Sequence, residues 1–217
     1  MPTSNVVVLG IERRSYFKRG TNEEVVNCRV FYYKTQDKHN SRLERGFFPL
    51  VMDVHPDFGI SDFESDFPAV YDFKSCLRRD LRSGKGIPVL QEIEFIDNVI
   101  VDKSDGFLVL GAKKLDFTTE DGSRYRGIKL FYLDVNGYQV SDDAVGLLPI
   151  EQNIADAKFD IFQRLPAYYD LDFGEVRGRG GSSVIKLFGA KFKAPWNHGS
   201  SQESSDPSLF STTQEAS

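Results

Sequence analysis

The sequence predicts an all-β fold made of two copies of one small unit. Four short blocks of the first half of the chain recur in the same order in the second half. Apolar residues come in short runs of Val, Ile, Phe, Tyr and Leu separated by polar turns, which is typical of strands. Each copy then has only about 90 to 100 residues, a length that suits a small β domain.

The internal duplication comes from matching blocks at an offset of 98 to 101 residues. Because the order of the blocks is kept and the offset varies by only three residues, the match is hard to obtain by chance. We expect a first repeat at 1–102 and a second at 103–194. The matching pairs are 29–33 (RVFYY) with 129–133 (KLFYL), 46–50 (GFFPL) with 146–150 (GLLPI), 8–10 (VLG) with 109–111 (VLG), and 67–71 (FPAVY) with 165–169 (LPAYY).

Five strands are expected in each repeat. Turns carrying Gly20-Thr21-Asn22 and Asp121-Gly122 join the first two strands of each copy into a hairpin. Residues 153–164 fit a short helix loosely, and their counterpart at 55–66 fits one less well. The expected strands are 5–17, 24–34, 46–52, 67–74 and 89–101 in the first repeat, and 106–117, 124–134, 145–150, 166–173 and 183–193 in the second.

Five strands, a long connection after the third and a closing hairpin are typical of the OB-fold barrel. The expected fold is therefore two tandem OB-like five-stranded barrels. An SH3-like barrel and a small sandwich remain alternatives, because strand number alone does not determine topology.

Composition and charge narrow the class of protein. The 217 residues are 40% hydrophobic and 13% aromatic, too apolar for a disordered chain. No apolar run has the length of a signal or membrane segment, which favours a cytoplasmic protein without a membrane partner. The net charge of −5 argues against coating nucleic acid by bulk charge, but it does not exclude a local basic groove.

The C-terminal segment 195–217 is expected to be a disordered, Ser-rich acidic tail. It has three acidic residues, Glu203, Asp206 and Glu215, and no Lys or Arg. The rest of the chain therefore has 27 basic and 29 acidic residues, a net charge of −2.

Signals for catalysis, metals or cofactors are nearly absent, so we expect no enzyme and no cofactor. The three histidines fall in presumed loops or in the tail. Cys28 and Cys76 lie 48 residues apart, without the spacing of metal ligands, and are expected to be reduced thiols. Cys28 is expected to be an ordinary core cysteine, since its counterpart in the second repeat is apolar. Neither glycine-rich segment, 83–86 or 177–181, matches a phosphate-binding loop.

The second strand of each repeat has the most informative pattern. Alternation places Val26, Cys28, Val30 and Tyr32, and likewise Ile128, Leu130 and Tyr132, on one face that resembles a barrel interior. The opposite face has a basic residue followed by an aromatic one in both copies. Such a face could stack bases and neutralise phosphates, or it could cover a second apolar layer between the copies. The outward residues are Arg29, Phe31 and Tyr33, and Lys129 and Phe131.

Basic and aromatic residues also gather on the expected hairpin ends. They either form solvated loop tips or clamp a nucleic-acid backbone. In the first hairpins these residues are Arg13, Arg14, Tyr16 and Lys18, and Lys113, Lys114, Phe117, Arg124, Tyr125 and Arg126. Between the last two strands they are Arg78, Arg79, Arg82 and Lys85, and Arg177 and Arg179.

The stretch 110–122 (LGAKKLDFTTEDG), followed by Gly127-Ile128-Lys129-Leu130, resembles a known family. It looks like the opening hairpin of small single-stranded DNA-binding proteins of phages and of plasmid-like or conjugative elements, and is similar to filamentous-phage DNA-binding proteins. The resemblance covers about 80 residues of the second repeat and is weaker in the first, where Ser15-Tyr16-Phe17 replaces Asp116-Phe117-Thr118. It implies OB-type barrels that bind single strands with little sequence choice.

Two functions follow as hypotheses. The first is a single-stranded DNA-binding protein for replication or recombination of a phage or mobile element, with replication or recombination proteins as partners of the tail. The second is a tandem β-barrel interaction or structural module without a nucleic-acid role. A monomer with two repeats and a homodimer are both compatible with the sequence. Burial of the outward Arg29/Phe31 and Lys129/Phe131 pairs between the copies would favour the second hypothesis.

Overall fold

The structure is a computed structural model that describes residues 4–17, 20–55, 59–63, 67–79, 84–102, 106–120, 122, 124–177 and 183–196. The fold is all-β. The first repeat contains β1 (Ser4–Phe17), β2 (Glu24–Lys34), β3 (His39–Asn40), β4 (Glu44–Gly46), β5 (Leu50–Val54), the 3-10 turn η1 (Ile60–Asp62), β6 (Ala69–Arg79) and β7 (Gly86–Asn98). The second contains β8 (Phe107–Thr118), β9 (Arg124–Asp134), β10 (Gln139–Val140), β11 (Ala144–Gly146), β12 (Ile150–Ala155), the turn η2 (Phe159–Ile161), β13 (Ala167–Arg177) and β14 (Ser183–Pro195).

The first repeat forms a closed five-stranded barrel. Its strands follow the order β1-β2-β5-β7-β6, and β6 pairs with β1 to close the sheet. All of these pairings are antiparallel except that of β5 with β7, where Asp53 lies opposite Val89. The barrel interior contains alternate residues of each strand, such as Val6, Val8 and Val30.

The second repeat has the same sequence of strands but its sheet is not closed. The order is β12-β9-β8-β13-β14, and no ladder joins β12 to β14 among the strands that the structure describes. The two edge strands are neighbours, and Lys186 of β14 lies 3.4 Å from Asp156, just beyond β12. The expectation of a second closed barrel is therefore not confirmed.

A short hairpin of each repeat pairs with the first strand of the other repeat. We call these hairpins the first arm (residues 39–46, containing β3 and β4) and the second arm (residues 139–146, containing β10 and β11). β4 pairs with β8, with Gly46 opposite Gly111, and β11 pairs with β1, with Gly146 opposite Gly10. The backbones approach so closely that a Cβ atom on Gly46 would lie 2.1 Å from the Leu110 carbonyl oxygen. Gly46 and Gly146 also have φ angles of +83° and +103°, which glycine adopts readily.

The arm exchange creates a core that belongs to both repeats. This shared core separates the two barrel-like interiors, and Trp196, Phe47 and Tyr33 are among its buried residues. It explains the continuous apolar run at the start of β1, since Val6 and Val8 face the barrel while Val7 and Leu9 face the shared core. The shared core comprises Val7, Leu9, Tyr33, Phe47, Val99, Leu108, Leu110, Leu133, Val135, Leu147, Tyr168 and Trp196.

Most expected elements are present, with three differences. The third strand of each repeat is divided into an arm strand and a barrel strand, β4 and β5 or β11 and β12. The segment 153–164 continues β12 to Ala155 and then forms only the turn η2, not a helix. The ordered chain also extends past residue 194, because β14 ends at Pro195 and Trp196 is buried with its indole N–H donating to the Ile100 carbonyl. The rest of the expected tail, 197–217, lies outside the described residues.

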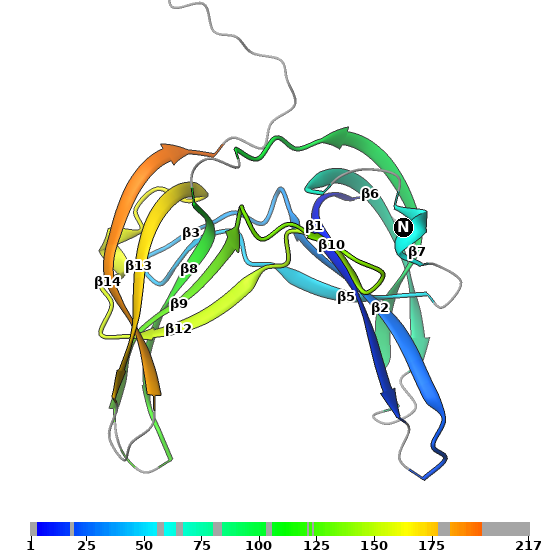
Figure 1. The fold of residues 1–217 in the computed structure, drawn as a ribbon, viewed down its shortest axis with the longest axis horizontal. Coiled ribbons are helices and arrows are strands. Elements are labelled where there is room, and N and C mark those ends of the chain that lie inside the picture. The colour runs from blue at the N-terminus through cyan, green and yellow to red at the C-terminus, as the bar shows by residue number, and fades with distance from the viewer. Residues whose placement is uncertain are drawn as a thin grey trace, which may run out of the picture.

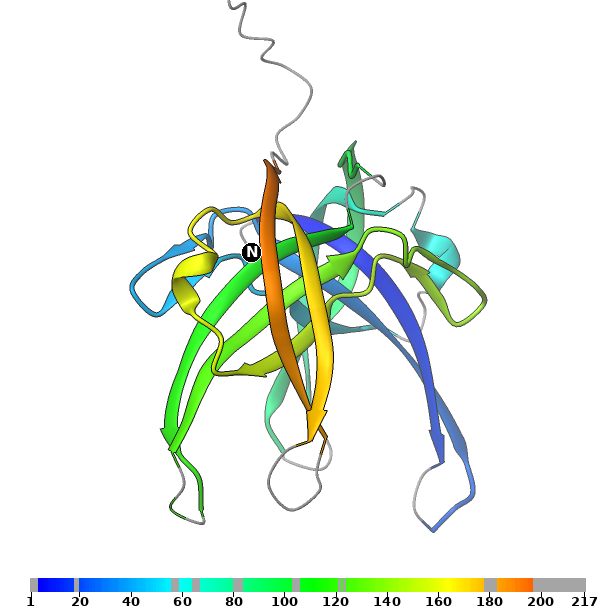
Figure 2. The ribbon, with the colours of Figure 1, turned by 60° about the vertical axis from the view of Figure 1, so that its left-hand side comes forward.

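The repeats lie side by side, and the long hairpins of both extend toward the same side of the molecule (Figure 1). The turned view shows β1–β2, β8–β9 and β13–β14 all reaching downward from the body (Figure 2). The hairpin ends of both repeats are therefore at the same end of the molecule.

Candidate nucleic-acid interface

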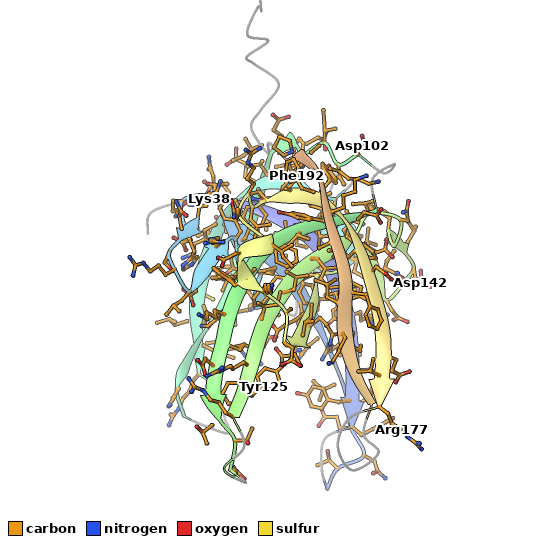
Figure 3. All side chains as sticks on the ribbon, turned by 90° about the vertical axis from the view of Figure 1, so that its left-hand side faces the viewer. Lys38, Asp102, Tyr125, Asp142, Arg177 and Phe192 are labelled. Atoms are coloured by element: carbon orange, nitrogen blue, oxygen red, sulfur yellow. The ribbon has the colours of Figure 1, made fainter. Side chains whose placement is uncertain are left out.

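Tyr125 and Arg177 mark the ends of two hairpins of the second repeat, while Asp102 lies at the opposite end of the molecule (Figure 3). Tyr125 belongs to the β8–β9 hairpin and Arg177 to β13–β14. Strand pairing thus places basic and aromatic residues that are far apart in the sequence on the same side of the fold.

The β8–β9 hairpin has an aromatic pair near its end. Phe117 lies directly opposite Tyr125, and their rings stack with centroids 5.1 Å apart and planes 22° apart. The Phe117 side chain is still 49% exposed. Partial burial, and secondarily Asp156, raise the pKa of Tyr125, so its hydroxyl stays neutral at physiological pH. The pair therefore offers an uncharged, partly exposed stacking surface.

Basic side chains surround this aromatic pair. Arg124 and Arg126 flank Tyr125 on β9, and both are exposed. The Arg124 guanidinium donates two hydrogen bonds to the Asp116 carboxylate, at 2.7 and 2.9 Å, and Arg126 is 4.0 Å from the same carboxylate. The hydrogen bond from Arg124 lowers the pKa of Asp116 and raises that of Arg124. The Asp116 carboxylate therefore orients Arg124, lies beside Arg126, and partly offsets the charge of the pair.

The first arm anchors the base of the same hairpin. Lys113 of β8 pairs with Glu44 of the arm at 2.8 Å, and this hydrogen bond lowers the pKa of the Glu44 carboxyl. Arg45 of the arm places its guanidinium 4.4 Å from the Phe159 ring centroid and 3.7 Å from Asp160. These contacts join the repeats beside the hairpin rather than leaving the arm in solvent.

The outward face of β2 and β9 differs from the expected stacking platform. Tyr33 is 1% exposed and stacks on Phe47 in the shared core, with centroids 4.5 Å apart. Phe131 is 9% exposed and contacts Phe48 of the first repeat, with centroids 5.1 Å apart. Phe31 is half-buried against the same core. These rings pack between the copies because the arms bring first-repeat and second-repeat residues together there.

The basic partners on this face are engaged within the protein. Arg29 is 3.4 Å from Asp53, and Lys129 pairs with Glu151 while lying 5.8 Å from the Phe131 ring. The side chains of Arg29 and Lys129 are both half-buried.

The face of β2 and β9 that was expected to be interior is buried at most positions. Val26 is the exception, since it is 40% exposed because β1 and β2 extend beyond the barrel. The prediction is confirmed for Val30, Tyr32, Ile128, Leu130 and Tyr132.

The remaining expected contact residues are mostly exposed on strand ends. Arg14 pairs with Glu12 at 2.5 Å, so part of its charge is compensated locally. The exposed members are Arg13, Arg14, Tyr16, Arg78, Arg79, Lys85, Lys113, Lys114 and Arg177. Lys18, Arg82 and Arg179 lie outside the described residues.

Cys28 lines a cavity of about 620 Å³ at the end of the first barrel, together with Arg13, His55 and Asp142. Burial raises the pKa of the Cys28 thiol, although nearby Arg13 opposes this effect. A raised pKa reduces the thiolate fraction of Cys28 at neutral pH. Both cysteines are free. Within the described ranges, no group of three His, Cys, Asp or Glu residues could hold a metal ion, and no helix could span a bilayer.

Two further exposed side chains, Arg42 of the first arm and Phe188 of β14, are not among the residues expected from the sequence. Arg42 is exposed beside the base of the β8–β9 hairpin, because the next residue, Leu43, accepts a 2.7 Å hydrogen bond from the Lys114 backbone. Phe188 is 62% exposed and its ring covers Gly174, whose added Cβ would lie 2.1 Å from it. The difference between Arg42 and its equivalent Asp142 is a signal that the sequence contains. No local pattern indicates Phe188, because its exposure depends on a β-bulge, where Asp172 lies opposite Gly189 and Phe173 opposite Leu187.

Comparisons with models of protein families, with curated proteins and with solved structures found no match to this chain.

Proposed function

We propose that the protein binds single-stranded DNA without strong sequence preference, through OB-like repeats and basic, aromatic hairpins. The observation that carries the proposal is the stacked, partly exposed Phe117–Tyr125 pair between Arg124 and Arg126. Base–aromatic stacking contributes about 1–3 kcal/mol per base, and neighbouring guanidinium groups neutralise phosphates. The strand order of the first barrel, with β5 parallel to β7, supports an OB-like topology.

The role in replication or recombination of a phage or mobile element is part of this proposal. It rests on the resemblance of the β8–β9 hairpin to phage and mobile-element proteins. A tail that recruits replication or recombination proteins and a cytoplasmic location are also part of the proposal.

The test is fluorescence anisotropy of the full chain with a labelled oligo-dT strand over a salt series. We expect binding at low salt, with a logarithm of the binding constant that falls linearly with the logarithm of the salt concentration, by about 0.7 per phosphate contact.

Phe117→Ala should weaken binding about five- to a hundredfold while the thermal melt stays cooperative. Ile100→Ala is the matched control, since Ile100 is 80% exposed and lies two residues from Asp102 at the opposite end of the molecule (Figure 3). No binding at low salt would refute the proposal.

The second candidate is an interaction or structural module without a nucleic-acid role. The burial of Phe131 and Tyr33 between the repeats favours it, because packing is then the main task of these rings. It predicts that the wild-type chain leaves oligo-dT anisotropy unchanged at every salt concentration. The same titration therefore separates the two candidates.

A further inference from the structure

The two long hairpins are equivalent in geometry but not in charge. Strand register aligns them residue by residue, since Phe117 lies opposite Tyr125 as Tyr16 lies opposite Val25. On the second strand, Arg124 and Arg126 occupy the positions of Glu24 and Val26. The β8–β9 hairpin therefore has two cations where the β1–β2 hairpin has an anion and an apolar side chain.

The exchanged arms increase this difference. The first arm lies beside the second hairpin, where the Lys114 N–H donates to the Leu43 carbonyl at 2.7 Å. The second arm lies beside the first hairpin, where the Arg13 N–H donates to the Asp143 carbonyl at 2.6 Å. The first arm thus brings Arg42 to the second hairpin, whereas the second arm brings Asp142 and Asp143 to the first.

The whole segments retain the asymmetry. Residues 113–129 and the arm segment 42–45 contain seven basic and four acidic residues. The equivalent residues 12–29 and 142–145 contain five of each, with Lys18 and Arg19 among the basic ones. The segments at the second hairpin are therefore net positive and those at the first hairpin are neutral, which favours attraction of a phosphate backbone to the second hairpin.

The aromatic residues show the same inequality. In the second hairpin two rings stack across the strands. In the first, Tyr16 is 53% and Phe17 is 70% exposed, but they face Val25 and Glu24 across the ladder. A base on the first hairpin would therefore stack on a single ring beside a carboxylate.

We infer that the single strand is held by the β8–β9 hairpin together with the arm of the other repeat, and that the β1–β2 hairpin contributes little. This inference rests on the proposed function and makes it specific. The binding surface is then composite, because Arg42 comes from the first repeat and the hairpin from the second. The duplication supplies one binding half and one half that mainly completes the fold.

Equivalent substitutions in the full-length chain test the asymmetry with the same oligo-dT titration. Lys114→Ala should reduce the magnitude of the salt slope by about 0.7, the value of one phosphate contact, whereas Arg13→Ala should leave it unchanged. Phe117→Ala should weaken binding about five- to a hundredfold and Tyr16→Ala less than about twofold. All four side chains are exposed, and unchanged thermal melts will show that the variants fold.

The two arms provide a second matched pair of variants. Arg42→Ala should also reduce the slope by about 0.7, while Asp142→Ala should not weaken binding. If the wild-type chain does not bind, the proposed function fails. If it binds and the paired variants lose affinity equally, or the first-hairpin variants lose more, the proposed function stands and the asymmetry is overturned.

Discussion

Phe47→Ala tests whether the two repeats form one cooperative unit. Phe47 belongs to the first arm's connection to β5, yet its ring lies in the shared core, 1% exposed and stacked 4.5 Å from Tyr33. Removing a fully buried phenylalanine ring typically costs about 3–5 kcal/mol through lost transfer free energy and the cavity left behind. A domain has only about 5–15 kcal/mol of stability in total, so the effect will be large.

Urea unfolding followed by two signals is the assay. Trp196 is the only tryptophan and is buried in the shared core, so its fluorescence reports on that core, while far-UV circular dichroism reports on both sheets. We expect coincident transitions in the wild type and in Phe47→Ala, with the variant less stable by about 3–5 kcal/mol. Leu43→Ala is the control in the same arm, since Leu43 is 58% exposed, and should change stability by less than about 0.5 kcal/mol. Two separate transitions, only one of them moved by Phe47→Ala, would refute the shared-core reasoning.

Three further predictions follow from the same interface. Gly111→Ala should cost about 1–3 kcal/mol in urea unfolding, because the new Cβ would lie 2.3 Å from the Phe47 carbonyl oxygen of the first repeat, whereas Gly86→Ala, with its nearest neighbour at 3.8 Å, should be near neutral. The separated repeats 1–102 and 103–217 should each lack a cooperative melt when purified alone and regain it when mixed; independent melting of either would contradict the arm exchange. Burial raises the pKa of Tyr33, so its contribution to stability is complete below the unfolded tyrosine pKa of 10 and decreases above it by about 1.4 kcal/mol per pH unit. Tyr33→Phe should therefore make the fall of stability above pH 10 less steep by that amount, while Tyr32, Tyr125, Tyr132 and Tyr169, whose pKa values are also raised, maintain the rest.

Strand positions follow from the sequence because alternation is a local property. Ile128 and Leu130 are both fully buried, as period-two alternation on β9 predicts. The same alternation places Phe131 on the opposite face but does not show what covers it. Its cover, Phe48, comes from the other repeat, and only the arm exchange brings the two rings together. Non-local packing is therefore the part of the site that local patterns do not determine.

One signal of the shared core was present in the sequence. The run Val6–Leu9 is continuously apolar, which is typical of a strand buried on both faces, and both faces are buried. A simple two-barrel arrangement with one solvent-facing surface gives no reason for such a run. The lack of closure between β12 and β14 has no comparable signal, since both strands have ordinary β-forming sequences.

Fusion of the two copies in one chain makes the proposed asymmetry possible. In a symmetric homodimer a single sequence supplies both arms, so any arginine at the position of Arg42 would appear at both equivalent sites. In the duplicated chain that position is Arg42 in one arm and Asp142 in the other, while Gly46 and Gly146 preserve the same close backbone approach. The residues that maintain the exchange have therefore stayed alike while the residues around the hairpins have diverged.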